Sequence, residues 1–226
     1  MKSNITKSIS ETNGLNNIDE SCINILSVGI STACEAEMKM IDKNNKCKVI
    51  ATTIDNEGIV FSNNILKEKG YDKSITIKLE DVSKTMPYND SYFDFIYARL
   101  VLHYLDKTNL KKALNELRRV LKVNKKLYIV VRSNKDIATT LSDSVYDEET
   151  NMTKHADYKT LYSNNVKYIY RSFHSKENIT NYLEDAGFTI KYIKEYDEHL
   201  YSDFERKEKS LMTSSLLEIL AINNVK

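Results

Sequence analysis

The stretch ILSVGISTACEAE, residues 25–37, has the residue types of a turn at which backbone amides meet a cofactor. An apolar, β-branched run leads to Gly29, and a helical pattern begins a few residues later. Glycine takes a positive φ without strain and lets a ligand approach the backbone. Ser31 and Ala33 stand where nucleotide-binding turns usually carry two more glycines, and a Cβ at a position of positive φ costs about 1 kcal/mol. We interpret the stretch as a functional but weakened cofactor loop, with the remnant of such a loop as the alternative.

Two aspartates follow later apolar runs, where a carboxylate would reach a ligand bound at the ends of strands. Asp55, with Asn56 beside it, follows the run CKVIATTI, and Asp81, with Val82 beside it, follows ITIKL. A carboxylate has two oxygens that accept hydrogen bonds, which suits it to hold hydroxyl or amine groups. Each aspartate taken alone is explained by solvated turn chemistry, but their spacing from Gly29 favours contact with a ligand.

Two basic side chains follow the fourth apolar run, FDFIYA, in the sequence RLVLHYL. The imidazole of His103 could accept a proton from a substrate nucleophile, although a histidine in so apolar a run is as often a packed core residue. Arg99 could hold an anionic substrate or pair with a nearby acid. The sequence has no metal-ligand cluster such as HExxH and no Ser-His-Asp arrangement, so we expect no metal site.

Strand and helix patterns alternate along the chain. Short apolar runs typical of strands buried on both faces of a parallel sheet occupy residues 22–28, 47–54, 75–79, 93–98 and 126–132. Helical patterns follow at 33–42, 57–70, 107–122 and 175–186. The clearest has a single apolar stripe formed by Leu110, Leu114, Leu117 and Leu121, with Asp106 or Thr108 as its N-cap.

The last two strands differ from the others. Residues 188–196 and 215–222 have strand character, but the charged segment between them has only weak helical periodicity. Without a crossover helix these two strands pair antiparallel. The expected fold class is therefore α/β, a Rossmann-like seven-stranded, mostly parallel sheet with a terminal antiparallel hairpin and helices on both faces.

The ends of the chain and one long connection stand apart from this pattern. Residues 1–21 are polar, and we expect a loose N-terminal arm or a short cap. Residues 22–226 then form a single domain, in which 133–173 is a lid or a substrate insertion, since loops of this length are usually functional or disordered. Its side chains that could contact a substrate are Tyr158, Tyr162, Tyr168, Tyr170, Arg171, Phe173 and His174.

In this order and spacing, the stretches resemble the class I S-adenosylmethionine-dependent methyltransferases. That family carries DLGCGTG at the first turn, LPF and then SFD before the fourth strand, and RVLKPGG before the fifth. This chain reads SVGISTA, MPYNDSYFD and RVLKVNK at these places. The resemblance covers residues 22–132, with weaker support from FHSKENITNYLEDAGFTI and the last strand. It implies a methyltransferase fold and S-adenosylmethionine as the cofactor.

The resemblance also implies roles for residues after the first two strands. Gly29, with Ser31 in the same turn, would open the backbone to the cofactor. Asp55, with Asn56 beside it, would accept hydrogen bonds from both ribose hydroxyls. The family's acidic residue that helps to hold the methionine amino group is Ser27 here, and a hydroxyl carries no charge. Because charge-assisted hydrogen bonds are about twice as strong as neutral ones, we expect weaker cofactor binding, by about 1 kcal/mol or more.

Further roles follow after the third and fourth strands. The carboxylate of Asp81 would take the exocyclic amine of adenine, while a backbone amide at Val82 faces a ring nitrogen. Ala98 and Arg99 would border the methionine end and the transferable methyl group. The sequence VNK replaces PGG before the fifth strand, where Asn124 tolerates the left-handed conformation.

Composition narrows the class of partner. With 33 Lys+Arg against 32 Asp+Glu, the formal net charge is +1, so no global field exists to hold nucleic acid. The start MKSNITKSIS is not a signal peptide, and no run is long enough to span a bilayer. The cysteines lack CxxC spacing and read as free thiols in a reducing compartment; they are Cys22, Cys34 and Cys47.

These inferences predict a cytoplasmic enzyme that transfers a methyl group from S-adenosylmethionine to a small-molecule substrate, with neither nucleic acid nor membrane as a partner. The sequence leaves the acceptor and the oligomeric state open. One rival is a methyltransferase-like scaffold that binds the cofactor poorly, or not at all, and acts through a partner. A second rival, a nicotinamide-dependent oxidoreductase, lacks the GxGxxG that a pyrophosphate demands.

Overall fold

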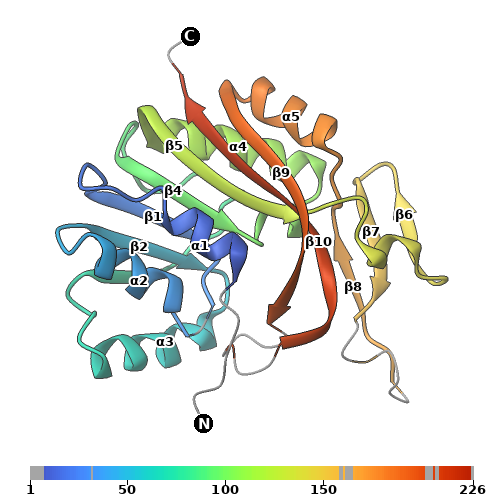
Figure 1. Cartoon of the computed structure of the whole chain (residues 1–226), viewed down its shortest axis with the longest axis horizontal. Helices are drawn as coiled ribbons and strands as arrows, with labels where there is room; N and C mark the ends of the chain where they lie inside the picture. The colour runs from blue at the N-terminus through green and yellow to red at the C-terminus, as the bar shows by residue number, and fades with distance from the viewer. Residues whose placement is uncertain are drawn as a thin grey trace.

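The main sheet contains seven strands among the residues that the computed structural model describes, which are 8–31, 33–157, 160, 165–201, 206 and 209–224. The strands are β1 (Asn24–Val28), β2 (Lys48–Thr53), β3 (Ile75–Leu79), β4 (Phe93–Arg99), β5 (Leu121–Arg132), β9 (Phe188–Tyr201) and β10 (Lys209–Asn223). Their order across the sheet is β3-β2-β1-β4-β5-β10-β9 (Figure 1). The first five are parallel, and β10 is antiparallel to both β5 and β9.

This order confirms the expected Rossmann-like, mostly parallel sheet with a terminal antiparallel hairpin. From β1 the chain moves outward through β2 and β3, and it then returns to pair β4 with the other edge of β1. Strand order therefore reverses between β1 and β4. In open α/β sheets, ligands bind outside the carboxyl ends of the strands at such a reversal.

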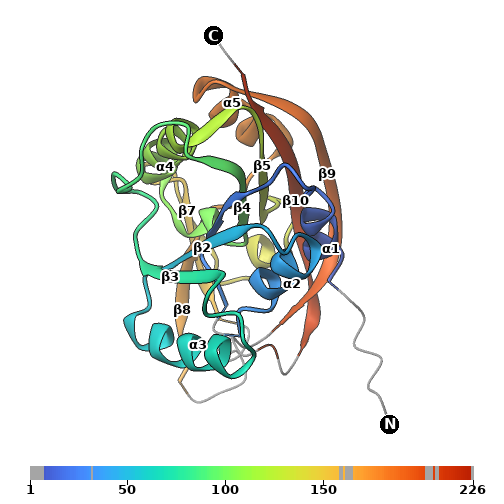
Figure 2. The ribbon, with the colours of Figure 1, turned by 90° about the vertical axis from the view of Figure 1, so that its left-hand side faces the viewer.

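Helices cover both faces of the sheet (Figure 2). Buried side chains of α4 and α5 join one apolar cluster, and those of α1, α2 and α3 join another. Strand β1 serves both, since Leu26 and Val28 belong to the first cluster and Ile25 to the second, as the alternation of a pleated strand requires. The helices are α1 (Ile9–Leu15), α2 (Glu35–Lys43), α3 (Asn56–Glu68), α4 (Lys107–Val120) and α5 (Lys176–Asp185).

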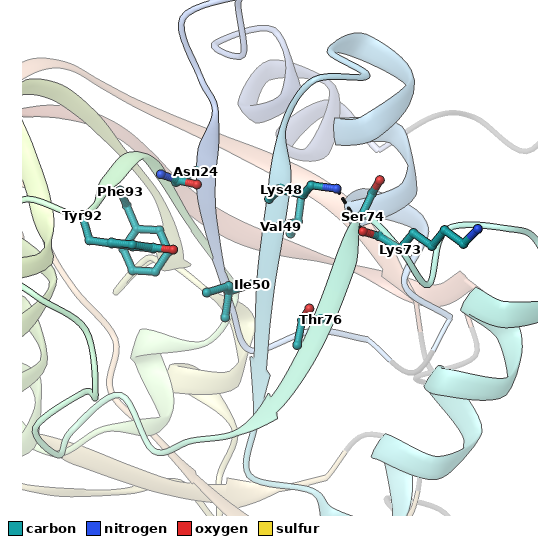
Figure 3. Close-up of a pocket in the computed structure, with 9 residues that line it drawn as sticks. All are labelled: Asn24, Lys48, Val49, Ile50, Lys73, Ser74, Thr76, Tyr92 and Phe93. Atoms are coloured by element: carbon teal, nitrogen blue, oxygen red, sulfur yellow. Dashed lines mark hydrogen bonds between the residues drawn. The ribbon is translucent and has the colours of Figure 1, made fainter.

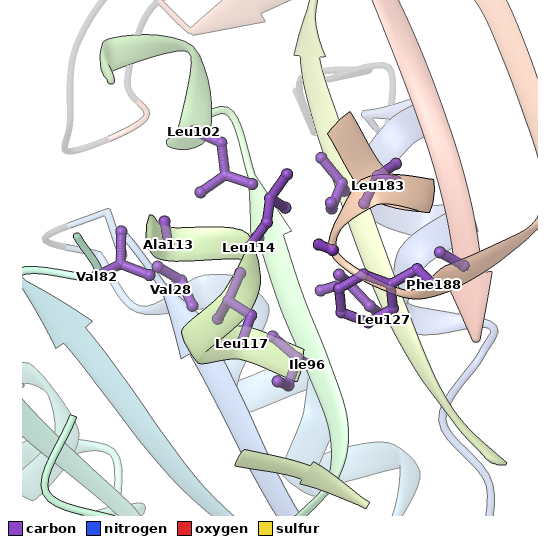
Figure 4. Packing of buried hydrophobic residues seen from close by; sticks show 14 of the residues in the cluster. Val28, Val82, Ile96, Leu102, Ala113, Leu114, Leu117, Leu127, Leu183 and Phe188 are labelled. Atoms are coloured by element: carbon purple, nitrogen blue, oxygen red, sulfur yellow. The ribbon is translucent and has the colours of Figure 1, made fainter. Parts of the chain in front are cut away.

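Helix α4 has three of the four leucines of the apolar stripe that its sequence predicts. Leu110, Leu114 and Leu117 are fully buried in the cluster on this face of the sheet, and Figure 4 shows Leu114 and Leu117 within it. Leu121 is also buried, but the helix ends at Val120 and Leu121 begins β5. The side chain of Asp106 accepts a hydrogen bond from the backbone N of Asn109 at 2.8 Å, which confirms Asp106 as the N-cap. Burial of this stripe fixes the helix on one face of the sheet, against residues of β4 and β5.

Strand β5 and the terminal hairpin are longer than the sequence indicates. Strand β5 begins at Leu121 directly after α4, and Asn124 adopts the left-handed conformation expected of it, with φ +62°. Strand β9 extends to Tyr201 and β10 begins at Lys209, and the residues of β9 alternate between the two faces: Glu198 and Leu200 are buried, whereas Asp197 and His199 are exposed. This period of two is hidden in the sequence because one of the inward residues is a charged glutamate.

The N-terminal segment is ordered where the structure describes it, in contrast to a loose arm. Ser8 caps α1, and Gly14 of α1 packs directly against the sheet. A Cβ on Gly14 would lie 2.5 Å from Cε2 of Tyr97 and 2.6 Å from Cε1 of Tyr128, so the helix approaches the strands as closely as backbone can. Polar composition concealed this helix because its buried positions include Ser10, Glu11 and Gly14.

The long connection after β5 contains a second sheet. Strands β6 (Val145–Asp147), β7 (Met152–Ala156) and β8 (Tyr168–Arg171) pair antiparallel in that order. Two short 3₁₀ helices lie near it, η1 (Leu102–Tyr104) after β4 and η2 (Ile137–Thr140) after β5. Its role as a lid or substrate insertion stays a prediction. Among the described residues, no helix is both long and apolar enough to cross a membrane.

Candidate functional site

The turn after β1 is held against the end of β2. The backbone N atoms of Gly29 and Ile30 both donate to the carbonyl oxygen of Thr52, each at 3.0 Å. Gly29 has φ +71°, and a Cβ there would lie 2.4 Å from Cγ2 of Val101, in the segment that follows β4. Both the backbone conformation and this close packing require glycine.

The strain expected at Ser31 is not present. Among the described residues of this loop, those with a positive φ are Gly29 and Cys34, the N-cap of α2, with φ +50°. The Cβ of Ser31 therefore costs no backbone strain, and the weakening predicted from it does not arise from conformation. Ala33 follows residue 32, which lies outside the described residues, and the strain expected at Ala33 stays a prediction.

Below the turn lies a buried carboxylate. Ser27 of β1 donates through Oγ to Oε1 of Glu37 on α2 at 2.5 Å, and the two residues are 1% and 2% exposed. Oε2 of Glu37 has no hydrogen-bond partner, and neither has the hydroxyl of Tyr97 on β4. Burial raises the pKa of Glu37. Sequence reasoning missed this glutamate, although it stands three residues after Cys34 and four before Ile41, on the apolar side of the helix.

Asp55 caps α3. Its Oδ1 accepts hydrogen bonds from the backbone N atoms of Glu57 at 3.1 Å and Gly58 at 3.0 Å, and Asn56 is the first residue of the helix. The residue that ends β2 is Thr53, whose Oγ1 accepts from the backbone N of Asp55 at 3.0 Å. The predicted bonds to ribose hydroxyls would have to come from a carboxylate that already serves the helix terminus.

Asp81 lies at the surface, whereas the next residue, Val82, lies in the core. Asp81 is exposed, and its Oδ1 accepts from the backbone N of Ser83 at 2.9 Å and from its hydroxyl at 2.7 Å. Val82 is buried in the cluster that includes α4. Asp81 thus fixes the loop after β3, and the contacts with adenine expected of Asp81 and Val82 stay predictions.

Arg99 ties three elements together. Its Nε donates to Oγ of Ser10 at 2.7 Å, and its Nη2 lies 2.9 Å from Oγ of Ser8 and 3.3 Å from Oε1 of Glu198 on β9. Ala98, the preceding residue, is fully buried. Of the two alternatives for Arg99, an anionic substrate or a nearby acid, these contacts favour the acid.

His103 lies on η1 among other basic side chains. It is 1% exposed, its Nδ1 has no hydrogen-bond partner, and burial lowers the pKa of its imidazole well below the usual value, helped by the charges of Arg171 and Arg132. We call this group the basic cluster; its members are His103, Arg132, His155, Arg171 and His174. Arg99 and His103 were both expected near the transferred methyl group. In the structure Arg99 contacts α1 and β9, whereas His103 lies on η1 with the basic cluster.

The basic cluster joins the main sheet to the three-stranded sheet. Arg132, the last residue of β5, donates through Nη1 to Oδ2 of Asp136 at 2.7 Å. Arg171 of β8 reaches Nε2 of His155 with Nη1 and the hydroxyl of Tyr104 with Nη2, both at 3.3 Å. The Nε atoms of both arginines are buried without a partner. The candidates Tyr158 and Tyr162 lie outside the described residues.

The buried histidines predict acid sensitivity. Burial lowers the pKa of His103, His155 and His174, so each takes up a proton more readily when unfolded. Their contribution to stability is present above the unfolded pKa, about 6.5, and is lost as the pH falls below it. We expect the free energy of unfolding in urea to fall between pH 7 and pH 5, by up to about 1.4 kcal/mol per histidine and pH unit.

Two variants separate this effect from general acid denaturation. His103→Asn should flatten the pH slope of the free energy of unfolding by removing one of the protonation sites. His199→Asn is the control for a histidine substitution outside the buried group, because His199 is exposed on β9. Equal slopes for the wild type and His103→Asn would contradict the expectation.

Two cavities lie at opposite edges of the molecule. One, of about 220 Å³, is lined by residues such as Asn24, Lys48 and Phe93 at the amino ends of the strands, away from the turn at Gly29 (Figure 3). The other, of about 500 Å³, lies between η1 with the start of α4 and the three-stranded sheet, and its lining includes Tyr104 and Tyr170. In the described residues, no group of three or more His, Cys, Asp or Glu side chains is placed to hold a metal ion.

Part of the chain matches a protein-family model. Residues 26–129, from β1 into β5, match a model described as a methyltransferase domain. This segment, just under half of the chain, is similar to a methyltransferase domain. The match includes the turn at Gly29 and the segments after β2, β3 and β4, and it confirms the resemblance seen in the sequence. No curated protein matches the chain significantly.

Solved structures share the methyltransferase fold over nearly the whole chain. An S-adenosylmethionine-dependent methyltransferase from Methanosarcina mazei is 17% identical with a TM-score of 0.72, and 93% of this chain and 96% of that one are covered. Geranyl diphosphate methyltransferase, solved in complex with S-adenosylmethionine, is 13% identical with a TM-score of 0.65, covering 94% and 84%. The [4+2]-cyclase SpnF is 14% identical with a TM-score of 0.66, covering 96% and 80%.

At these identities the structures show a shared fold, and the cyclase shows that proteins named for another reaction use it too. One of these structures is a complex with S-adenosylmethionine. The residues that would hold it have to be argued from this chain's own geometry.

Proposed function

We propose that this chain transfers a methyl group from S-adenosylmethionine to a small-molecule acceptor. The observation that carries the acceptor class is the cavity of about 500 Å³ between η1 and the three-stranded sheet. Pockets for small molecules typically measure about 300–1,000 Å³. Because η1 follows β4 within three residues, the cavity borders the carboxyl edge of the sheet, where the cofactor of this fold class is expected. The buried free thiols of Cys22, Cys34 and Cys47 support a reducing, cytoplasmic location.

The residues present suit the cofactor on the side of β1. Gly29 opens the backbone, and the buried Oε2 of Glu37 and hydroxyl of Tyr97, both without partners, provide polar atoms where a polar ligand would be expected. When bound, S-adenosylmethionine supplies the methyl group and its own leaving group. The chain then has to orient the acceptor, exclude water and take up at most one proton.

His103 is the candidate for proton uptake. Its lowered pKa keeps the imidazole neutral at pH 7, which is the protonation state that a general base needs, and its Nδ1 has no partner. The hydroxyl of Tyr104, next along η1, lines the cavity and is held by Arg171. An acceptor in the cavity would thus meet an ordered wall, which favours the orientation that an in-line displacement requires.

The experiment that tests the proposed function is methyl transfer from cofactor labelled in its methyl group. Purified protein is incubated with a metabolite extract, a protein extract and total RNA in separate reactions. We expect label in a low-molecular-weight product only. Label in protein or RNA, with none in the small-molecule fraction, would contradict the proposed acceptor class.

Asp55 provides a separate test of the ribose contact. Asparagine caps helices as well as aspartate does, so Asp55→Asn should leave the free energy of unfolding unchanged. It removes the charge that would strengthen a bond to a ribose hydroxyl, and we expect the Kd for S-adenosylmethionine to rise about tenfold. Isothermal titration measures it. An unchanged Kd would mean that Asp55 serves only the end of α3.

The second candidate function is a scaffold that binds the cofactor weakly and acts through a partner. The observation that favours it is that Oδ1 of Asp55 and Oδ1 of Asp81 are both engaged by neighbouring residues of their own loops. Titration with millimolar S-adenosylmethionine separates the two functions. Heat of binding together with thermal stabilisation supports the enzyme, and the absence of both supports the scaffold.

A further inference from the structure

Glu37 is a buried acid without a counter-charge in contact with it. Glu37 is 2% exposed. Its Oε1 accepts a hydrogen bond from the hydroxyl of Ser27, and its Oε2 has no hydrogen-bond partner. A buried carboxylate that lacks a partner destabilises the fold, and proteins retain such groups chiefly where a ligand completes them. The orphan oxygen therefore points to a cation or a hydrogen-bond donor that is supplied from outside the chain.

The nearby charges do not supply that partner. Glu11, on α1, is a second acid in this region, and it binds Lys39 at 2.7 Å and Arg206 at 2.5 Å. These two cations are thus already paired with Glu11. Another buried polar atom on which the charge of Glu37 acts is the hydroxyl of Tyr97, which also has no partner.

The position of Glu37 relates it to the cofactor turn. Ser27 lies in β1 two residues before Gly29, and its hydroxyl fixes the carboxylate of Glu37 at the strand. The methyltransferase resemblance calls for an acid at position 27, and this chain has serine there. Ser27 and Glu37 together place a carboxylate beside the same strand position, donated by α2 instead of β1.

We propose that Glu37, oriented by Ser27, binds the ammonium group of the methionine part of S-adenosylmethionine. This assignment rests on the proposed function, since it requires that cofactor. An ammonium group is a cation with three donors, so it can neutralise Glu37 and still donate elsewhere. The chain has moved the counter-charge of this subsite from the strand to the helix, and Ser27 now serves to position it.

The test compares three ligands by isothermal titration. S-adenosylmethionine and S-adenosylhomocysteine both carry the ammonium group, whereas 5′-methylthioadenosine keeps the adenosyl part with a methylthio group and lacks the amino-acid part. For Glu37→Gln we expect the Kd of the first two to rise at least tenfold and the Kd of 5′-methylthioadenosine to stay as in the wild type. The matched control is Glu68→Gln at the exposed end of α3, which should bind all three as the wild type does.

A second pair of variants covers the case in which Glu37→Gln does not fold. Ser27→Asp with Glu37→Leu returns the carboxylate to the strand, and Ser27→Asn with Glu37→Leu has the same shape without the charge. The aspartate variant should bind S-adenosylmethionine at least tenfold more tightly than the asparagine variant, with equal affinity for 5′-methylthioadenosine.

The outcomes separate this assignment from the proposed function. If the wild type binds none of the three ligands, the proposed function is wrong and the role of Glu37 falls with it. The other outcome is that the wild type binds S-adenosylmethionine, but neither Glu37→Gln nor the pair of Ser27 variants changes the affinity for the ammonium ligands alone. S-adenosylmethionine is then still the cofactor, and the role of Glu37 is wrong. A loss of affinity for all three ligands alike would also overturn it, because it would indicate a structural role in the loop.

Discussion

Replacing Gly29 by alanine is expected to unsettle both the fold and the cofactor turn. A Cβ at φ +71° costs about 1 kcal/mol or more, and this one would lie 2.4 Å from Cγ2 of Val101, so the chain after β4 has to move. Overpacking of this kind costs about 1–3 kcal/mol more. We expect the free energy of unfolding to fall by about 2–4 kcal/mol and the Kd for S-adenosylmethionine to rise more than tenfold.

Gly70 provides the matched control. It also has a positive φ, +78°, at the end of α3, but nothing lies within 4 Å of the Cβ that alanine would add. Gly70→Ala should therefore cost only about 1 kcal/mol, with unchanged cofactor affinity. Adding Val101→Ala to Gly29→Ala should recover part of the lost stability. Equal effects of alanine at the two glycines would contradict the role given to the contact with Val101.

Replacing Arg99 by methionine is expected to have the second large effect. Its guanidinium is 13% exposed and faces the carboxylate of Glu198, which is 4% exposed, together with the hydroxyls of Ser8 and Ser10. Removing one partner of a buried ion pair leaves the other charge without compensation and costs about 3–5 kcal/mol. We expect urea unfolding to show a loss of about 3 kcal/mol.

A double-mutant cycle identifies the cause of that loss. In the variant Arg99→Met with Glu198→Gln, no uncompensated carboxylate remains. The loss in the free energy of unfolding of this double variant should therefore be smaller than the sum of the losses of the two single variants, by about 1 kcal/mol or more. A cost under about 1 kcal/mol for Arg99→Met, as for an exposed pair, would mean that α1 and β9 are held by other contacts.

The elements of the fold that could be predicted are those whose pattern comes from burial alone. Strands β1 to β4 are apolar runs of the parallel sheet, and the observed bounds differ from the expected ones by two residues at most. Burial on both faces was wrong for β3, which lies at the edge of the sheet with alternate residues exposed. The leucine stripe and the N-cap of α4 are equally local signals. The mostly parallel sheet with a terminal hairpin then followed from alternation and from the methyltransferase resemblance, whereas the order of its strands was not predicted.

The elements that sequence reasoning missed bury polar residues. Helix α1 buries Ser10 and Glu11, the hairpin turns Glu198 inward, and α2 buries Glu37. For Glu11 and Glu198 the cations that make burial tolerable come from distant parts of the chain, as Arg99 does for Glu198. A pattern of apolar spacing does not contain such pairings, because they depend on the tertiary fold.

The turn after β1 could be predicted from the sequence, whereas the binding roles of the candidate site residues stay predictions. Gly29 has the positive φ that favours glycine, which is a local requirement, but its close contact with Val101 depends on the tertiary fold. Asp55 was expected to be free for a ligand, yet it caps α3, because any aspartate before a helix competes for the amides of its first turn. His103 lies in the core, as an imidazole within an apolar run can, and its catalytic role stays a prediction.

A crystal structure of the protein with S-adenosylhomocysteine would test the central claim most directly. The account predicts the ligand at the carboxyl edge of β1 and β2, with its amino group against Glu37 and its backbone contacts at Gly29. Density for the ligand elsewhere, or a complex that cannot be formed at millimolar ligand because side chains fill the space between Gly29 and Glu37, would contradict it.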